Sequence, residues 1–321
     1  MTAITQTSQK SKKRANVFQQ IGSLIGLVLI IAVISILDPS FLEPTNLFNI
    51  LRQVSINALI AFGMTFVILT GGIDLSVGSI LALSSAVVAG LMASGMNASL
   101  AMGIGLMAGL AMGVVNGVII AKGKIAPFIA TLATMTIFRG LTLVYMDGRP
   151  ITGLGNSLTF QMLGRGYFLG IPVPAVLMLL TFAILYFILK KTTFGRRTFA
   201  IGGNEEATLL SGINVNRMKI MIYGISGLLA AFAGIVLTSR LDSAQPTAGT
   251  SYELDAIAAV VLGGTSLSGG KGWIAGTLIG ALIIGVLNNG LNLLGVSSFF
   301  QQVVKGLVIL LAVLLDRKKQ A

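Results

Sequence analysis

Cysteine and histidine are both absent from the 321 residues, and charged residues make up only 10% of the chain. Disulfides, thiolate metal sites and imidazole ligands are therefore excluded, which disfavours a metal-dependent membrane enzyme or a histidine proton relay. A soluble domain carries roughly 25% charged residues, whereas this chain is 55% hydrophobic with a mean hydropathy of +0.92. The composition predicts an integral membrane protein with no metal and no cofactor.

Repeated apolar runs predict an all-α polytopic protein with about ten transmembrane helices. The predicted spans are about 18–37, 48–70, 74–93, 98–120, 126–146, 172–190, 217–239, 252–267, 273–294 and 299–315. The eighth is short, so a broken or re-entrant helix is the alternative there. We expect one transmembrane domain over 18–316, with a basic tail 1–17 before it and a tail 317–321 after it.

Basic residues predict the orientation of the chain. Lys10, Lys12, Lys13 and Arg14 precede the first span, and most other basic residues fall on the same side of the predicted membrane. The opposite loops contain most of the acids. The positive-inside rule thus places both termini and the long loop 190–219 in the cytoplasm. Topology and anionic lipid headgroups account for the net charge of +12, and the scattered basic residues predict no nucleic-acid partner.

Two loops share a glycine-rich pattern. VILTGGIDLSVGS at Val67–Ser79 and AVVLGGTSLSGGKG at Ala259–Gly272 both have an apolar run, Gly-Gly, two residues and Leu-Ser. Both fall on the cytoplasmic side after spans of the same direction, which predicts a parallel internal repeat; chance similarity of glycine-rich loops is the alternative. The positions of interest in these repeat loops are Gly71, Gly72, Asp74, Ser76, Gly78, Gly263, Gly264, Ser268 and Gly270.

Asp74 and Ser76 are expected to cap the helix that begins beside them. A substrate or proton role for Asp74 is the alternative. The second loop does not have the spacing of a phosphate-binding loop, and no nucleotide site is visible. Between the loops, a separate run of glycines four residues apart predicts close helix packing: Gly105, Gly109, Gly113 and Gly117.

Charges inside the predicted spans are few: Arg52, Arg139 and Lys305. We expect Arg139 to pair with a carbonyl or a loop-end acid, or to reach the interface; direct substrate contact is the alternative. Amide side chains are candidates for a pathway that suits a neutral, hydroxyl-rich solute, although they also bond helices together. These amides are Asn57, Asn116, Asn288, Asn289 and Asn292.

The longest cytoplasmic loop contains GGNEEATLLSGINVNRMK at Gly202–Lys219. Its residues predict a short helix capped by Asn204, with Glu205 and Glu206 in the first turn and Gly212 at its end. Ala207, Leu209 and Leu210 have no core of their own in such a loop. They are available to a groove on another protein, or to the membrane surface.

GGNEEATLLSGINVN resembles the coupling segment of permease subunits in bacterial ABC importers, whose loose signature is Glu-Ala-Ala followed by Gly. GGIDLSVGS, APFIATLATM and SAQPTAGTSYELDAIAAVVLGGTSLSGG resemble the sugar class of these permeases, and most of all those for ribose. The likeness runs from about Asn46 to the C-terminal tail. Either Glu205 or Glu206 can open the coupling motif.

The resemblance implies an inner-membrane homodimer, an ATP-binding cassette ATPase beneath it and a periplasmic sugar-binding protein above it. The cargo would be a neutral sugar, ribose or a related monosaccharide. The chain itself would be no enzyme, since ATP hydrolysis would belong to the partner subunit. The alternative is an ion-coupled secondary carrier or facilitator for a small polar solute.

Overall fold

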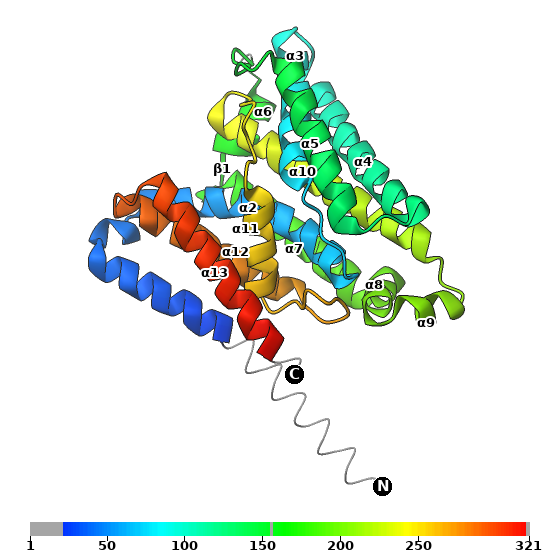
Figure 1. The fold of residues 1–321 in the computed structure, drawn as a ribbon. Helices are drawn as coiled ribbons and strands as arrows, with labels where there is room; N and C mark the ends of the chain where they lie inside the picture. Colours follow the sequence, from blue (N-terminus) through cyan, green and yellow to red (C-terminus); the bar gives the residue numbers. More distant parts are fainter. Residues whose placement is uncertain (1–21, 155–156, 319–321) are drawn as a thin grey trace.

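The computed structural model describes residues 22–154 and 157–318, and helices dominate them (Figure 1). The helices are 22–37, η1 (Pro39–Leu42), α2 (Pro44–Leu69), α3 (Val77–Ala93), α4 (Ala98–Gly123), α5 (Pro127–Met146), α6 (Leu158–Arg165), α7 (Val173–Lys191), α8 (Thr193–Gly203), α9 (Glu205–Leu210), α10 (Val215–Leu241), α11 (Tyr252–Leu262), α12 (Ile274–Leu293) and α13 (Ser298–Lys318). A two-stranded antiparallel hairpin joins β1 (Tyr167–Phe168) to β2 (Ile171–Pro172). The predicted all-α class is confirmed apart from this hairpin.

Each predicted span overlaps a helix of the structure, although several helix ends differ from the predicted ones. Six helices are long and apolar enough to cross a membrane, namely α2, α4, α5, α7, α10 and α12, and shorter apolar helices cover 22–37, 77–93 and 298–311. The chain is therefore a polytopic α-helical membrane protein, while the number of crossings stays a prediction. The predicted tail 1–17 and the start of the first span lie outside the described residues.

Several predicted span boundaries differ from the ends of the helices. Helix α3 begins at Val77 rather than at 74, and α11 ends at Leu262 rather than at 267. Helix α13 continues to Lys318, beyond the predicted end of the last span at about 315. The differences at α3 and α11 arise because hydropathy does not detect backbone turns, whereas a glycine-containing turn lies at each of these two places.

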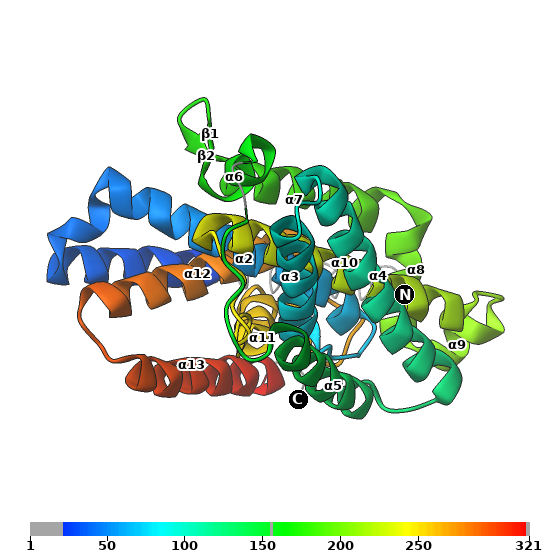
Figure 2. The same ribbon diagram turned by 90° about the horizontal axis from the view of Figure 1, so that it is seen from above.

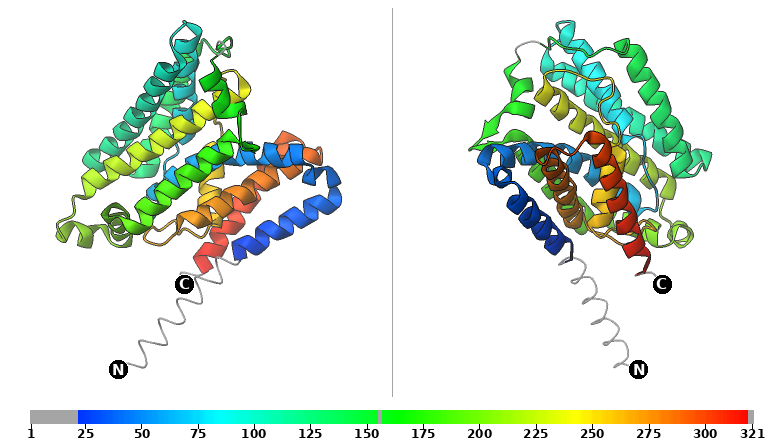
Figure 3. Two further views of the ribbon diagram at one scale, coloured as in Figure 1. Left: turned by 180° about the vertical axis from the view of Figure 1, so that it is seen from behind. Right: turned by 60° about the vertical axis from the view of Figure 1, so that its left-hand side comes forward.

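The helices form two diverging groups that meet along α2, α10 and α11. In Figure 1, α3, α4, α5 and α10 lie together at the upper right, while helix 22–37, α12 and α13 lie at the lower left. Helix α10 packs against α2, α3 and α4, and α2 also contacts α11 and α12. Seen from above, α11 lies between α13 and α5 (Figure 2). Helices α8 and α9 project at the end where α13 finishes (Figures 1 and 3).

The segment that precedes α11 packs against the first turn of α3 and against α5. Residues 70–76 connect α2 to α3, and residues 242–251 connect α10 to α11. A methyl group added at Gly78 would lie 2.2 Å from the carbonyl oxygen of Gly249. Arg139 on α5 donates hydrogen bonds to the carbonyl oxygens of Pro246 (2.9 Å) and Ala248 (2.7 Å). The prediction that Arg139 pairs with a carbonyl is confirmed, and the guanidinium holds the second segment in place.

The glycine row of α4 is packed directly against its neighbours. Methyl groups added at its four glycines would lie 2.2 to 2.6 Å from α3 or α10, for example 2.2 Å from the carbonyl oxygen of Tyr223 at Gly113. A Cβ essentially never approaches other heavy atoms this closely, so only glycine lets the helices lie at this separation. The predicted close packing is confirmed.

Gly113→Ala is expected to destabilise the folded protein by about 1–3 kcal/mol, since the added methyl group overpacks the contact between α4 and α10. Gly103→Ala is the matched control, because Gly103 lies in the same helix with nothing within 4 Å of its added methyl group. Thermal unfolding in detergent micelles measures both variants. Equal midpoints would show that the close contact does not need glycine.

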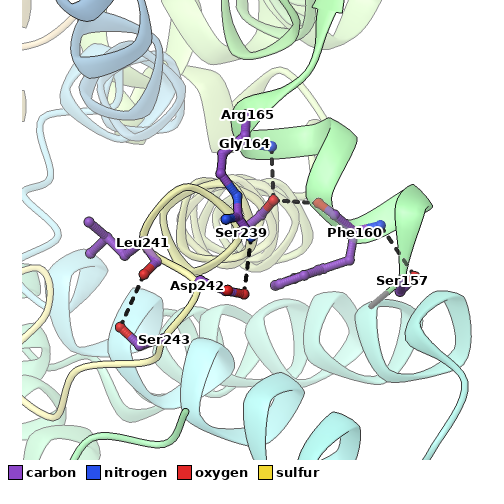
Figure 4. A network of polar contacts seen from close by, with 8 residues as sticks. All are labelled: Ser157, Phe160, Gly164, Arg165, Ser239, Leu241, Asp242 and Ser243. Atoms are coloured by element: carbon purple, nitrogen blue, oxygen red, sulfur yellow. Dashed lines mark hydrogen bonds and ion pairs between the residues drawn. The ribbon is translucent and has the colours of Figure 1, made fainter. Parts of the chain in front are cut away.

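The loop between α5 and α7 is fastened to the end of α10. Ser239 on α10 donates a hydrogen bond to the carbonyl oxygen of Phe160 and accepts one from the backbone N–H of Gly164 at 2.9 Å. Arg165 pairs with Asp242 at 3.1 Å (Figure 4). Helix α6 is therefore held on α10 by buried hydrogen bonds and a solvent-exposed ion pair.

Candidate functional site

Helix α9 is the predicted short cytoplasmic helix. The Asn204 side chain accepts a hydrogen bond from the backbone N–H of Ala207 at 2.9 Å, as an N-cap does. Glu205 and Glu206 occupy the first turn, where the helix dipole favours negative charge. The C-cap is Ser211 rather than the predicted Gly212. Gly212 follows it with a positive φ of 80°, and its N–H bonds to the Leu209 carbonyl oxygen.

The apolar residues of α9 face away from the rest of the chain. Leu209 is 60% exposed and Leu210 is 83% exposed, and Ala207 is exposed as well. Thr208 is the exception, because it is buried and its hydroxyl bonds to the Asn204 carbonyl oxygen. Sequence reasoning missed Thr208, whose side chain faces the protein. The exposed leucines leave one apolar face of the helix without a partner in the chain.

The two glutamates of α9 differ in their contacts. Lys219 at the start of α10 donates to both carboxylate oxygens of Glu205, at 2.7 and 2.8 Å. Glu206 forms no ion pair with any described residue. Glu205 therefore joins α9 to α10, whereas Glu206 is exposed on the same helix as Leu209 and Leu210.

Helix α8 brings the coupling segment against both repeat loops. The backbone N–H of Gly270 donates a 2.9 Å hydrogen bond to the carbonyl oxygen of Leu69, the last residue of α2. Gly202 of α8 lies directly over this bond. Sequence reasoning missed this contact of Gly202, although the Gly-Gly pair beside the coupling helix was a signal for it.

The repeat loops begin with similar turns and then diverge. Gly71 and Gly264 both have positive φ, 77° and 87°. The neighbouring glycines differ, because Gly72, after Gly71, approaches the Tyr223 hydroxyl, whereas Gly263, before Gly264, packs against Gly276 of α12. The predicted alignment paired Gly71 with Gly263, so the turns match one residue later than expected. The parallel repeat itself stays a prediction.

Asp74 and Ser76 form a buried polar cluster; Ser76 stands at the N-cap position of α3, but its side chain makes no capping hydrogen bond. Asp74 Oδ1 accepts from the backbone N–H of Ser76 at 3.1 Å and from its hydroxyl at 2.6 Å. Asp74 Oδ2 accepts from the hydroxyl of Ser226 on α10 at 2.9 Å, and Asn116 on α4 donates to the Ser76 hydroxyl at 2.7 Å. Both Asp74 and Ser76 have no exposed surface. The cluster ties the segment before α3 to α4 and α10.

The other candidate pathway amides occupy different surroundings. Asn289 exchanges hydrogen bonds with Asn46 at 3.0 and 2.8 Å, which joins α12 to α2. Asn292 accepts from Gln301 at 2.8 Å, and Asn57 is buried within α2. Asn288 is buried on α12, and its Oδ1 has no partner among the described residues. The structure does not gather these amides into one site, and those with partners connect helices.

An ion pair that includes a buried carboxylate was not predicted from the sequence. Lys305 on α13 lies 3.0 Å from Asp255 on α11, and Asp255 is only 4% exposed. The sequence places Asp255 at the start of a span and Lys305 within another, but it does not show that they meet. Within the described ranges, no group of three or more acidic, histidine or cysteine residues could hold a metal ion.

Known transport proteins are similar to this chain over most of its length. The family described as "Branched-chain amino acid transport system / permease component" matches residues 46–313. The chain is 71% identical to the ribose import permease protein RbsC of Bacillus subtilis over 98% of each chain. It is 56% identical to the RbsC of Escherichia coli K12 over 100% of each chain. It is 42% identical to the D-allose transport system permease protein AlsC of E. coli K12, over 97% of this chain and 96% of AlsC. No solved structure matches.

Proposed function

Because the chain belongs to the family of branched-chain amino acid transport system permease components, we propose that it is the permease subunit of an ATP-driven importer for ribose or a closely related monosaccharide. It is a transport component, and ATP hydrolysis belongs to a partner subunit. The identity of 71% to a ribose import permease over nearly the whole chain carries the choice of ribose. The branched-chain amino acid wording describes the wider family, whereas the relatives at high identity are sugar permeases.

The proposed assembly follows from the resemblance in the coupling segment and the repeat loops. Two copies of the chain lie in the bacterial inner membrane, each with about ten spans in one domain over 18–316. Both termini face the cytoplasm. An ATP-binding cassette ATPase lies below, a periplasmic sugar-binding protein docks above, and membrane lipid surrounds the exposed aliphatic side chains.

The exposed face of α9 supports the proposed ATPase contact. Leu209 and Leu210 would enter a groove of the ATPase, and Glu206 would be available to a basic group beside it. ATP binding then shifts the equilibrium of the permease between its outward-facing and inward-facing states. The size of this shift is set by the difference in affinity of the ATPase for the two states. No catalytic residue of the permease is required for this step.

Leu209→Ala with Leu210→Ala is expected to weaken capture of the ATPase subunit at least about tenfold, since apolar anchors dominate the binding energy of such interfaces. The fold should be unchanged, because both side chains are exposed. The experiment is a pull-down from native membranes with tagged permease. Leu158→Ala is the matched control, as Leu158 is 72% exposed on the outer helix α6.

Reconstituted vesicles then test the transport itself. Permease, ATPase and binding protein together should accumulate radiolabelled ribose only when ATP is supplied. The proposal is wrong if wild-type permease captures no ATPase and an imposed ion gradient still drives sugar uptake into vesicles that contain the permease alone. That outcome would establish the secondary carrier instead.

A further inference from the structure

We propose that four glycines pass the movement of the coupling segment to both repeat loops, with Gly202 as the positioning residue. These are Gly71, Gly202, Gly269 and Gly270, which we call the glycine junction. The inference rests on the proposed function, because it assumes that an ATPase moves α9.

The junction consists of backbone atoms in direct contact. Gly202 lies over the hydrogen bond between the Gly270 N–H and the Leu69 carbonyl oxygen. A methyl group at Gly202 would be 1.8 Å from that oxygen and 2.4 Å from that nitrogen. In the loop that contains Gly269 and Gly270, a methyl group at Gly269 would be 2.8 Å from the Gly71 nitrogen, and one at Gly270 would be 2.9 Å from the Gly203 nitrogen. No side chain separates the three segments.

Such a contact transmits displacement without absorbing it. Long side chains between two elements can change rotamer and take up a small movement, whereas close-packed backbone has low compressibility. Glycine at these positions is what permits the backbones to touch. A movement of α8 must therefore displace the end of α2 and the loop 268–270 together.

The junction is connected to the coupling helix on one side. A single residue, Asn204, separates α8 from α9, and its backbone N–H still bonds to the carbonyl oxygen of Ala200 in α8 at 3.0 Å. Helix α8 also packs against α9, α7 and α10. A force applied at α9 is thus applied to Gly202 through one short, hydrogen-bonded unit.

On the other side the junction leads to the interior of the membrane domain. Leu69 is followed by residues 70–76, which end in the buried cluster of Asp74 and Ser76. The loop 268–270 follows α11, which carries the ion pair with Lys305. The four glycines therefore lie where the coupling segment meets the two non-helical connections that follow α2 and α11.

The alternative is that the glycines serve close packing only. Packing alone predicts that Gly202→Ala lowers stability, and that uptake falls only as far as the amount of folded protein falls. Transmission predicts something else: the folded variant retains its ATPase but no longer couples hydrolysis to transport. Measurements of ribose uptake and of stimulated ATP hydrolysis, both per mole of assembled complex, distinguish the two explanations.

The experiment compares Gly202→Ala with Gly203→Ala in vesicles that contain permease, ATPase and sugar-binding protein. Gly203 is the matched control, because it is exposed in the same helix with nothing within 4 Å of its added methyl group. We expect Gly202→Ala to capture the ATPase and to keep its basal hydrolysis. Its stimulation by ribose-loaded binding protein and its ribose uptake per complex should fall about tenfold or more. Gly203→Ala should match the wild type.

Equal uptake per complex for Gly202→Ala and Gly203→Ala would overturn the glycine junction while leaving the proposed function intact. Failure of the wild type to capture any ATPase would instead overturn the proposed function. The readout of ATPase capture therefore distinguishes the two failures.

A cross-link keeps the inference testable if Gly202→Ala does not fold. The chain has no cysteine, so Gly203→Cys with Lys271→Cys supplies the only two thiols, both at exposed positions. Lys271 follows Gly270, whose added methyl group would lie 2.9 Å from the Gly203 nitrogen, so a short, cleavable thiol reagent can bridge the pair. If the junction moves as one body, the bridged permease keeps ribose uptake. Loss of uptake on bridging, restored by cleavage, would show that the segments slide and would overturn the inference.

Discussion

Asp74→Ala is expected to destabilise the permease by about 3 kcal/mol and to reduce ribose uptake below detection. Three donors, the Ser76 backbone N–H and the hydroxyls of Ser76 and Ser226, would each lose an acceptor in a site without exposed surface. Leaving a buried donor unsatisfied costs about 1–3 kcal/mol. Asn116 also depends on the Ser76 hydroxyl, so the loss extends to the contact between α4 and the segment before α3.

Asp74→Asn is the informative companion variant. Its amide oxygen can accept from both groups of Ser76, and its NH₂ group can donate to Ser226, whose hydroxyl can turn to its own helix. No described lysine or arginine forms an ion pair with Asp74, and an unpaired buried charge is costly. We therefore expect Asp74→Asn to unfold near the wild-type temperature and to retain most uptake. Damage equal to that of Asp74→Ala would show that the negative charge itself is needed.

Lys305→Met should destabilise the permease by about 3–5 kcal/mol, the usual cost of removing one partner from a buried ion pair. Asp255, at 4% exposure, would be left without its partner on α13. Among the described elements α13 packs mainly against α11 and α12, so detachment of α13 should precede global unfolding. Thermal unfolding measures the loss, and proteolysis of the C-terminal helix in micelles locates it.

Combining Lys305→Met with Asp255→Leu is expected to restore much of the stability. Apolar residues in place of both charges leave neither one buried without compensation, and such replacements are often neutral or stabilising. The double-mutant cycle then isolates the coupling between the two residues. If each single variant unfolds at the wild-type temperature, the ion pair contributes nothing to the attachment of α13.

Features governed by neighbouring residues could be predicted from the sequence. The cap of α9 was predicted at residue level, because an asparagine before two glutamates satisfies the first amides of a helix by local chemistry. The glycine row of α4 was predicted because a four-residue repeat forms one face of any helix. A carbonyl was one of the alternatives predicted for Arg139, because an unpaired charge inside a membrane is costly.

Features that depend on distant segments could not be predicted. Asp255 and Lys305 are 50 positions apart and meet only because α11 and α13 cross. Asp74 was expected to cap a helix, but its carboxylate accepts a hydrogen bond from Ser226 on α10, 152 positions later in the chain. Gly202 stands inside the segment that was singled out, yet its contacts come from α2 and from a loop almost 70 positions later. A single sequence does not show such pairings.

Helix α10 has a consequence for how the two sides of the membrane communicate. Its 27 residues span about 40 Å. Lys219 at one end holds Glu205 of the coupling segment, and Ser239 near the other end holds helix α6, which we predict to lie on the outer side. Partners bound at the two ends would thus act on the same helix. Thermodynamic linkage is reciprocal. If an outer partner changes the affinity of the permease for the ATPase by a certain factor, the ATPase must change the affinity of the permease for that outer partner by the same factor. A binding protein that favours the ATPase-bound state of α10 would itself be held more tightly by a permease that has its ATPase.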